Sequence, residues 1–429
     1  MKKLFTYEQF LTEREVRNTD LESVFEGGAY GHLTHPFEDL GLTMRDVKDM
    51  IDSTVEGAFG PENFVQEKTD GQQLSISWKD GKLIAARNKS HLKNVGAEAM
   101  SAQDLALKFK DRGDIEIAYN AAMRDLQSSI GSLSPAQLEK MFANGKKFAS
   151  IEIMTPVTQN TVPYGQDLIV FHGIVEYDEN GNSIDEDKQA GRDLAKMIAD
   201  ANAASQEMFY VRGPQEIPIK PFKNTKARAQ YYNKKLSEVM KDAGINLDST
   251  VQDFVLGRAK NIVKGLDVDI PEGSIEGIAM RLGDINKSYS IANMKKDMGP
   301  ELTKEYSDFE KKNSKMIKKQ IYAPLENLFL EVGTEMMMHM EAFLSANPTA
   351  AGEHMRKEIE DTINKIRKNG DATDVEKLEH ELSRVAAVGG LDNIVPTEGI
   401  TFVYKGKVYK YTGIFAPIHQ IRSILAYKK

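Results

Sequence analysis

The stretch Glu67-Lys68-Thr69-Asp70-Gly71 contains a lysine that could act as a nucleophile. A lysine amine attacks a phosphorus or carbonyl centre only after losing its proton, which requires desolvation or a nearby cation to lower its pKa. Asp70 would orient the loop or hold the lysine, and Gly71 would let the backbone come close to a ligand. A pattern as short as Lys-x-Asp-Gly also fits a polar turn with an exposed lysine. Partners elsewhere in the chain must decide between these two interpretations.

Alternating apolar residues and serines follow this stretch and predict a β-hairpin. The segment 74–78 alternates, Asp80-Gly81 is a strong hairpin turn signal, and the segment 83–87 returns. We therefore expect Lys68 at the start of an antiparallel sheet, with its amine projecting from a strand end. Arg87 and the charged residues after it would face the same cleft and bind a ribose or phosphate, or else form a solvated strand end.

Two further segments, 148–154 and 167–175, have the apolar character of buried strands. The first carries Glu152. Because burying an unpaired carboxylate is costly, Glu152 should meet a cation, a hydrogen-bond donor or a ligand hydroxyl. A structural salt bridge would satisfy it equally. The second contains Phe171 and His172, and His172 is most simply a hydrogen-bonded histidine of the core.

Two later segments combine a strand pattern with the dipeptide Glu-Gly, and they contain Glu276 and Glu398 respectively. A turn and a second strand follow Glu398, and this second strand carries Lys407 and Lys410. We therefore expect another hairpin near the C-terminus, with a carboxylate on its first strand and lysines on its second.

Helical patterns dominate between these segments. Residues 301–388 have long apolar faces, a capping box and glycine stops, which predict a helical unit. Residues 220–241 predict a basic helix that contains Tyr231 and Tyr232. This helix is either a solvated face or a patch that binds a phosphate backbone with aromatic stacking.

Composition excludes several classes of function. The chain has 429 residues, of which 41% are hydrophobic and 28% charged, and it contains no apolar run of membrane-spanning length. It has no cysteine, which excludes a disulfide framework, a thiolate nucleophile and a thiolate zinc site. The formal net charge is -8, so a nucleic acid would have to bind a local basic patch.

The N-terminal residues 1–13 have the pattern of a short amphipathic helix, with Leu4, Tyr7 and Leu11 on one face. A docking terminal helix is one interpretation. The segment also resembles the capsid-targeting leaders of internal head proteins in large tailed phages, which a prohead protease removes. The matching cleavage site is Leu11-Thr12-Glu13. The whole chain resembles a group of proteins from such phages that share the leader and Lys-x-Asp-Gly.

Taken in order, the strand motifs resemble those of the covalent nucleotidyltransferase superfamily, which comprises ATP-dependent RNA and DNA ligases and mRNA capping enzymes. Lys68 matches the lysine that becomes nucleotidylated, and Asp70 and Gly71 complete that motif. The resemblance implies nucleotide-binding roles for Glu67, Gly71, Arg87, Glu152, Phe171, Lys407 and Lys410.

The same resemblance implies a metal held by Glu398 and Glu152. Glu398 matches the carboxylate of the fourth motif, because Lys410 then lies in a clear strand between two tyrosines. Glu276 is the alternative, and Lys287 or Lys295 would then supply the fifth motif.

The fold implied is α+β: an antiparallel-sheet nucleotidyltransferase domain, ATP-grasp-like as in ligase adenylation domains, with a helical insertion. The implied parts are a cleavable leader at 1–13, the first part of the nucleotidyltransferase domain at 14–300, the insertion at 301–388 and the last strands at 389–429. Gln73 stands where DNA ligases and capping enzymes carry arginine, and no OB-fold pattern follows the last motif. Both departures favour an RNA ligase.

The function implied is an ATP-dependent polynucleotide ligase, RNA ligase rather than DNA ligase, with a covalent lysyl-AMP intermediate at Lys68 and Mg²⁺ or Mn²⁺ as cofactor. Its partners would be nucleic-acid ends in the host cytoplasm. One alternative is a phage head internal protein with a degenerate, non-catalytic fold, packaged with prohead or capsid proteins. Another is a nucleotidyltransferase that modifies a protein or a small molecule.

Overall fold

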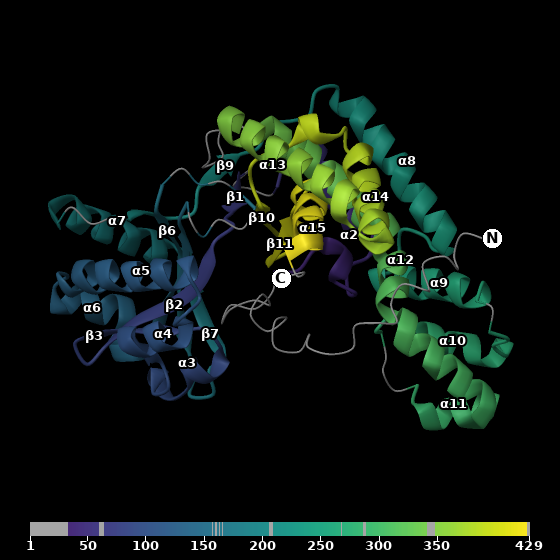
Figure 1. The fold of residues 1–429 in the computed structure, drawn as a ribbon, viewed down its shortest axis with the longest axis horizontal. Helices are drawn as coiled ribbons and strands as arrows, with labels where there is room; N and C mark the ends of the chain where they lie inside the picture. Colours follow the sequence, from purple (N-terminus) through teal and green to yellow (C-terminus); the bar gives the residue numbers. More distant parts are fainter. Residues whose placement is uncertain are drawn as a thin grey trace.

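The computed structural model describes residues 33–59, 64–156, 158, 161–162, 164, 166–205, 209–266, 268–285, 289–340 and 348–426. The leader expected at residues 1–13 lies outside the described residues. Within them the protein is an α+β structure with two mainly antiparallel sheets, each covered by helices (Figure 1). The predicted α+β class with antiparallel sheets is therefore confirmed.

The first sheet brings together strands from both ends of the chain in the order β11-β10-β1-β9. These neighbours are all antiparallel: β11 (Lys407–Tyr411), β10 (Gly399–Tyr404), β1 (Phe64–Lys68) and β9 (Glu216–Pro218). One face of this sheet points Val65, Ile400 and Phe402 into the largest apolar core. The helix α2 (Met44–Glu56), whose N-cap is Thr43, contributes to the same core.

The second sheet has the order β4-β3-β2-β5-β6-β7, and β8 lies parallel to β6. Its strands are β2 (Gln72–Lys79), β3 (Lys82–Ala86), β4 (Met100–Ser101), β5 (Lys147–Met154), β6 (Leu168–Tyr177), β7 (Ser183–Asp187) and β8 (Tyr210–Arg212). The predicted hairpin is β2–β3, and its turn residues Asp80 and Gly81 have φ of 49° and 75°. Positive φ at both positions is what a two-residue type I′ turn requires.

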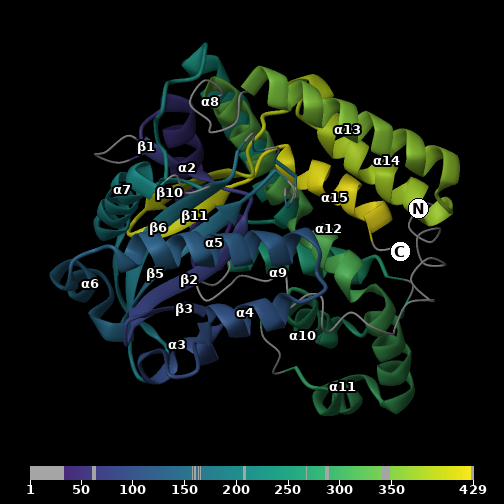
Figure 2. The same ribbon diagram turned by 60° about the vertical axis from the view of Figure 1, so that its left-hand side comes forward.

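Helices pack on one face of the second sheet and form a second apolar core with residues such as Leu74, Ile151 and Phe171. They are α4 (Ala102–Phe109), α5 (Asp114–Gly131), α6 (Pro135–Phe142) and α7 (Lys188–Ser205). Figure 2 shows α4 and α5 lying over this sheet. The short α3 (Lys89–Gly96) packs on the other face, where Leu92 contacts Ala86 and Phe148.

From residue 225 to residue 387 every regular element that the structure describes is a helix. These elements are α8 (Thr225–Ala243), α9 (Val251–Lys264), α10 (Glu272–Leu282), α11 (Ile291–Met298), α12 (Pro300–Met340), α13 (Pro348–Asn369) and α14 (Ala372–Ala387). The last helix, α15 (Phe415–Ala426), shares a separate apolar cluster with α13 and α14. Of the helices described, none has both the length and the apolar character needed to cross a membrane.

One predicted strand is wrong. Residues 275–281 lie in α10, where Ile275, Ile278, Ala279 and Leu282 are all buried. Their spacing of three, four and seven positions is the period of a helix face. The Glu-Gly dipeptide at 276–277 therefore belongs to a helix, whereas Gly399 begins β10 and Glu398 immediately precedes it.

Candidate functional site

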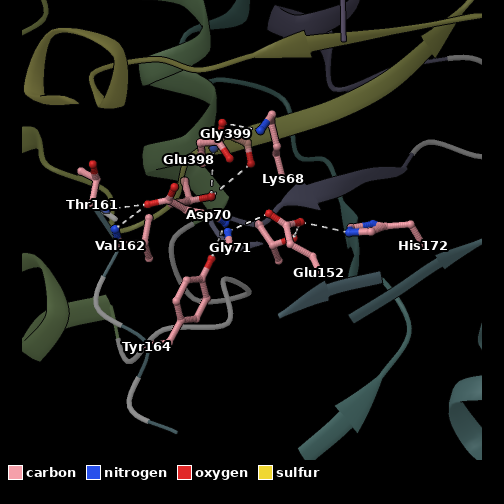
Figure 3. Close-up of polar contacts among 12 residues, drawn as sticks. Lys68, Asp70, Gly71, Glu152, Thr161, Val162, Tyr164, His172, Glu398 and Gly399 are labelled. Atoms are coloured by element: carbon pink, nitrogen blue, oxygen red, sulfur yellow. Dashed lines mark hydrogen bonds and ion pairs between the residues drawn. The ribbon is translucent and has the colours of Figure 1, made fainter. Parts of the chain in front are cut away.

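Lys68 lies where the chain passes from one sheet to the other. It ends β1, and residues 69–71 lead directly into β2 of the second sheet. Strand alternation points Val65 into the first core and Lys68 to the opposite face. In the register of β1 and β10, Lys68 is opposite Gly399, and its Nζ forms an ion pair with Oε1 of the preceding residue, Glu398 (Figure 3). Both side chains remain 19% exposed.

The glycines of both motifs are explained by close packing. A Cβ on Gly71 would lie 2.8 Å from the carbonyl oxygen of Ile153 and 2.9 Å from Cγ of Glu152. A Cβ on Gly399 would overlap the carbonyl oxygen of Tyr411. Any larger residue at either position would push apart the backbone segments next to Lys68 and Glu398.

Glu152 holds the loop that follows Lys68. Its Oε1 accepts the backbone N–H of Gly71 at 2.7 Å, and its Oε2 accepts the hydroxyl of Thr69. The Nε2 of His172 lies 3.0 Å from the same Oε2. Burial acts to raise the pKa of Glu152, but His172, Lys68 and the Thr69 hydroxyl together keep that pKa below its usual value.

His172 reaches Glu152 because β6 has a bulge at this point. Ile151 pairs with Phe171 and Ser150 with Gly173, so His172 is the extra residue in the ladder. Bulges redirect side chains, and here the bulge turns an imidazole toward a carboxylate. The sequence favoured a core histidine at this position. The structure instead makes His172 a partner of the site, and the polar residue within an apolar strand was the available signal.

Asp70 anchors a second loop to the first. Its Oδ2 accepts the backbone N–H groups of Thr161 at 2.7 Å and Val162 at 2.9 Å. The backbone N–H of Asp70 donates to the hydroxyl of Tyr164 at 2.9 Å, and burial raises the pKa of that phenol. Of the two roles expected for Asp70, these contacts support orientation of the loop.

The charges around Lys68 are strongly coupled. Burial acts to lower the pKa of Lys68, but Glu398, Glu152 and Asp70 outweigh burial and leave that pKa above its usual value. Burial raises the pKa of Glu398 to about 7, although the Lys68 ammonium opposes this shift. Burial and the charge of Lys68 lower the pKa of Lys410 to about 8. The pKa values of Glu398 and Lys410 are therefore both displaced toward neutral pH.

Three predicted site residues lie on the wrong face of their strands. Phe171 is fully buried in the second core, on the face that the helices cover. Arg87 is on that face too: its guanidinium lies 5.7 Å from the centroid of the Phe109 ring and donates to the carbonyl of Gln73 at 2.7 Å. Lys407 lies on the face of Tyr409, and its Nζ is 3.1 Å from Asp39. The expectation that these residues face Lys68 is therefore wrong.

Two further candidates also lie away from the Lys68 amine. Glu67 alternates with Lys68 along β1, is buried, and pairs with Nη2 of Arg212 at 3.1 Å. Glu276, on α10, is exposed and pairs with Lys260 at 2.9 Å. Of these two carboxylates, the structure therefore brings Glu398, and not Glu276, to Lys68.

The basic helix predicted at 220–241 corresponds to α8, and acidic side chains of α12 pair with part of it. Arg228 pairs with Glu335, and Lys235 pairs with Glu331. These pairs favour the solvated-face interpretation over a patch for a phosphate backbone.

The resemblance implies a metal held by Glu398 and Glu152, which both lie near Lys68. Among the residues that the structure describes, no three or more His, Cys, Asp or Glu side chains are grouped to hold a metal ion. Mg²⁺ is commonly bound by one or two carboxylates together with waters and substrate phosphates. Glu152 accepts hydrogen bonds from Gly71 and Thr69, and Glu398 is paired with Lys68, so these two carboxylates alone do not form a closed protein metal site.

Two hollows in the described part of the chain are lined by other residues than Lys68 and Glu398. One of about 650 Å³ is lined by Arg45 and residues between Ser237 and Asp248. Another of about 50 Å³ is lined by residues that include Phe329, Arg384 and Gly413. Because neither hollow is lined by Lys68 or Glu398, the junction is a candidate site on account of its charged side chains.

Comparison of the chain with protein-family models, with curated proteins and with solved structures finds no match. A function for this chain therefore has to be inferred from the geometry around Lys68.

Proposed function

We propose that this protein is a covalent nucleotidyltransferase that takes AMP from ATP onto Lys68 and passes it to a polynucleotide end. One observation carries the proposal. A partly exposed lysine at the junction of two sheets contacts Glu398, and its charge acts on Lys410. An amine nucleophile beside a second cation and a metal-binding carboxylate is the arrangement that phosphoryl transfer needs.

The first step forms one bond and breaks one. The lone pair of the neutral Lys68 amine attacks the α-phosphorus of ATP. The bond from that phosphorus to the bridging oxygen breaks, and pyrophosphate leaves with the electron pair. After the attack the nitrogen is positively charged, and it loses one proton to solvent. The product is a phosphoramidate between Lys68 and AMP. A divalent cation bound with the nucleotide would supply positive charge that stabilises the leaving group.

The protein's own residues control when Lys68 can react. In the free protein the surrounding carboxylates raise the pKa of Lys68, so its amine is protonated at rest. Positive charge that neutralises Glu398 would lower this pKa and favour loss of the proton. The Lys410 ammonium is placed to attract phosphate oxygens, and Asp70 and Glu152 hold the loop that fixes Lys68.

The geometry around Lys68 supports the nucleotidyl transfer step, whereas the proposal of a ligase acting on RNA ends has a separate basis. It rests on the resemblance of the motifs and on Gln73, which replaces the arginine of DNA ligases and capping enzymes. A nucleotidyltransferase that modifies a protein or a small molecule would share the first step and differ in the acceptor.

The first experiment is incubation of the protein with α-³²P-labelled ATP and Mg²⁺, followed by denaturing electrophoresis. We expect a labelled adduct in the wild type and in Lys407→Ala, whose lysine is exposed and paired with Asp39. We expect no adduct in Lys68→Ala, because this variant lacks the proposed nucleophile. Nick-sealing assays on RNA and DNA then identify the acceptor.

Absence of the adduct from the wild type at any nucleotide or cation tested would contradict the enzymatic proposal. The packaged, non-catalytic protein would then be the better account. Equal labelling of wild type and Lys68→Ala would show that another residue is modified, and would contradict the assignment of Lys68.

A further inference from the structure

The C-terminal helix α15 lies between the Asp70 loop and the helical pair α13–α14. On one side, Ile418 and Ile421 belong to the apolar cluster formed with α13 and α14. On the other, Phe415 packs in a cluster with Val162 and Tyr164, which lie in the loop that Asp70 anchors. A displacement of α13 and α14 would therefore shift α15 and, through it, that loop.

Arg422 makes the polar connection across this interface. Its Nη1 donates to the carbonyl oxygen of Thr161 at 3.1 Å, and its Nη2 lies 3.7 Å from a carboxylate oxygen of Glu358 on α13. The side chain is 26% exposed, so most of the guanidinium is enclosed by protein. A planar guanidinium can hold two acceptors in fixed directions, which a lysine ammonium does not do.

The carbonyl that Arg422 binds belongs to the same peptide unit as the N–H of Val162. That N–H donates to Oδ2 of Asp70 at 2.9 Å (Figure 3). Because the peptide group is planar, fixing its carbonyl also fixes the direction of its N–H. Asp70 is 5% exposed, and a buried carboxylate depends on such donors. The contacts thus run from Glu358 through Arg422 and one peptide group to Asp70, two residues beyond Lys68.

We propose that Arg422 is a positioning residue for Lys68 and that it ties the placement of the Lys68 loop to the α13–α14 pair. Arg422 touches neither Lys68 nor Glu398, so its effect passes through the 161–162 peptide and Asp70. The catalytic consequence rests on the proposed function, whereas the structural coupling does not.

The test compares Arg422→Gln and Arg422→Lys with a matched control, Arg367→Gln, in the full chain. Arg367 lies on α13 and pairs with Glu379 in an exposed contact at 3.4 Å. We expect Arg422→Gln to slow formation of the Lys68 adduct by about 10- to 100-fold with little change in the KM for ATP, because a small displacement of the nucleophile affects attack more than binding. Arg422→Lys should fall between Arg422→Gln and the wild type, and the control should match the wild type.

A second measurement does not depend on nucleotide. Hydrogen exchange at the amides of Thr161 and Val162 should be faster in Arg422→Gln than in the control, while the thermal midpoint stays within a few degrees of wild type. Unchanged exchange at these amides together with a wild-type adduct rate would overturn the proposal. If the wild type forms no adduct at all, the proposed function fails, and the exchange experiment alone decides whether Arg422 positions the loop.

Discussion

At the scale of single residues, the free protein holds Lys68 as an unreactive ammonium. Glu398 contacts its Nζ, and Glu152 and Asp70 add negative charge nearby. The same burial that concentrates these charges raises the pKa of Glu398 to about 7. The protonation of Glu398 should therefore affect how the free energy of unfolding depends on pH, as well as the reactivity of Lys68.

Substituting Glu398 by glutamine should change how stability depends on pH. The folded-state pKa of Glu398, about 7, lies above the ordinary value of 4.5, so the folded state binds its proton more tightly than the unfolded state. The stability that the protein gains from binding this proton is present below pH 4.5 and is lost as the pH rises through 7. Between pH 5 and 8 the free energy of unfolding of the wild type should fall by up to about 3 kcal/mol relative to that of Glu398→Gln.

Urea unfolding of both proteins at several pH values measures this difference. Glu276→Gln serves as the control, because Glu276 is exposed and lies on α10. A stability difference between wild type and Glu398→Gln that is constant from pH 5 to 8 would show that Glu398 titrates outside this window.

At the scale of elements, the junction depends on how closely strands approach each other. The loop 69–71 passes over β5, and Gly71 leaves no room for a side chain between itself and Ile153. On β6, the bulge at His172 turns the imidazole toward Glu152. These backbone features, more than the charged residues themselves, set the geometry of the site.

Gly71→Ala should therefore destabilise the protein and disturb the site together. The new Cβ would lie 2.8 Å from a backbone oxygen that cannot move without shifting β5. We expect a loss of about 1–3 kcal/mol in the free energy of unfolding and a slower adduct reaction. Gly273→Ala is the control, because a Cβ at Gly273 meets nothing within 4 Å and lies in a helix, where alanine is favoured. Equal stability of the two variants, measured by urea unfolding, would contradict this account.

At the scale of the whole molecule, two apolar cores lie behind the two sheets, and short connections join the sheets at one junction. Residues 69–71 join β1 to β2, and residues 213–215 join β8 to β9. Arg212 and Glu67 bridge these two connections with an ion pair in which the Glu67 side chain is fully enclosed. Loss of this pair should weaken the attachment of one sheet to the other.

Arg212→Ala would remove the guanidinium that pairs with the buried Glu67 carboxylate. Breaking one side of a buried pair costs about 3–5 kcal/mol, because a buried charge loses an oppositely charged partner. Arg192→Ala removes a comparable pair with Glu216, whose side chain is 39% exposed, and should cost about 1 kcal/mol or less. Thermal or urea unfolding distinguishes the two, and a cost for Arg212→Ala no larger than for Arg192→Ala would show that the pair does not secure the junction.

The sequence by itself determined much of the local structure. The alternation at 74–87 with Asp80-Gly81 predicted β2–β3, and the pattern around Lys405-Gly406 predicted β10–β11. It also identified Lys68, Glu152 and Glu398 as charged residues in strand contexts. These features were readable because turn chemistry and strand period depend on neighbours within a few residues.

Only the tertiary structure decided which of these residues meet. Lys68 and Glu398 become neighbours through the register of β1 and β10, which no local pattern encodes. Phe171, Arg87 and Lys407 were placed at the site because they lie on or beside the right strands, but they project from the faces that pack against the cores or their rims. The exposed or buried status of a strand face depends on what packs against it, and those partners come from distant parts of the chain.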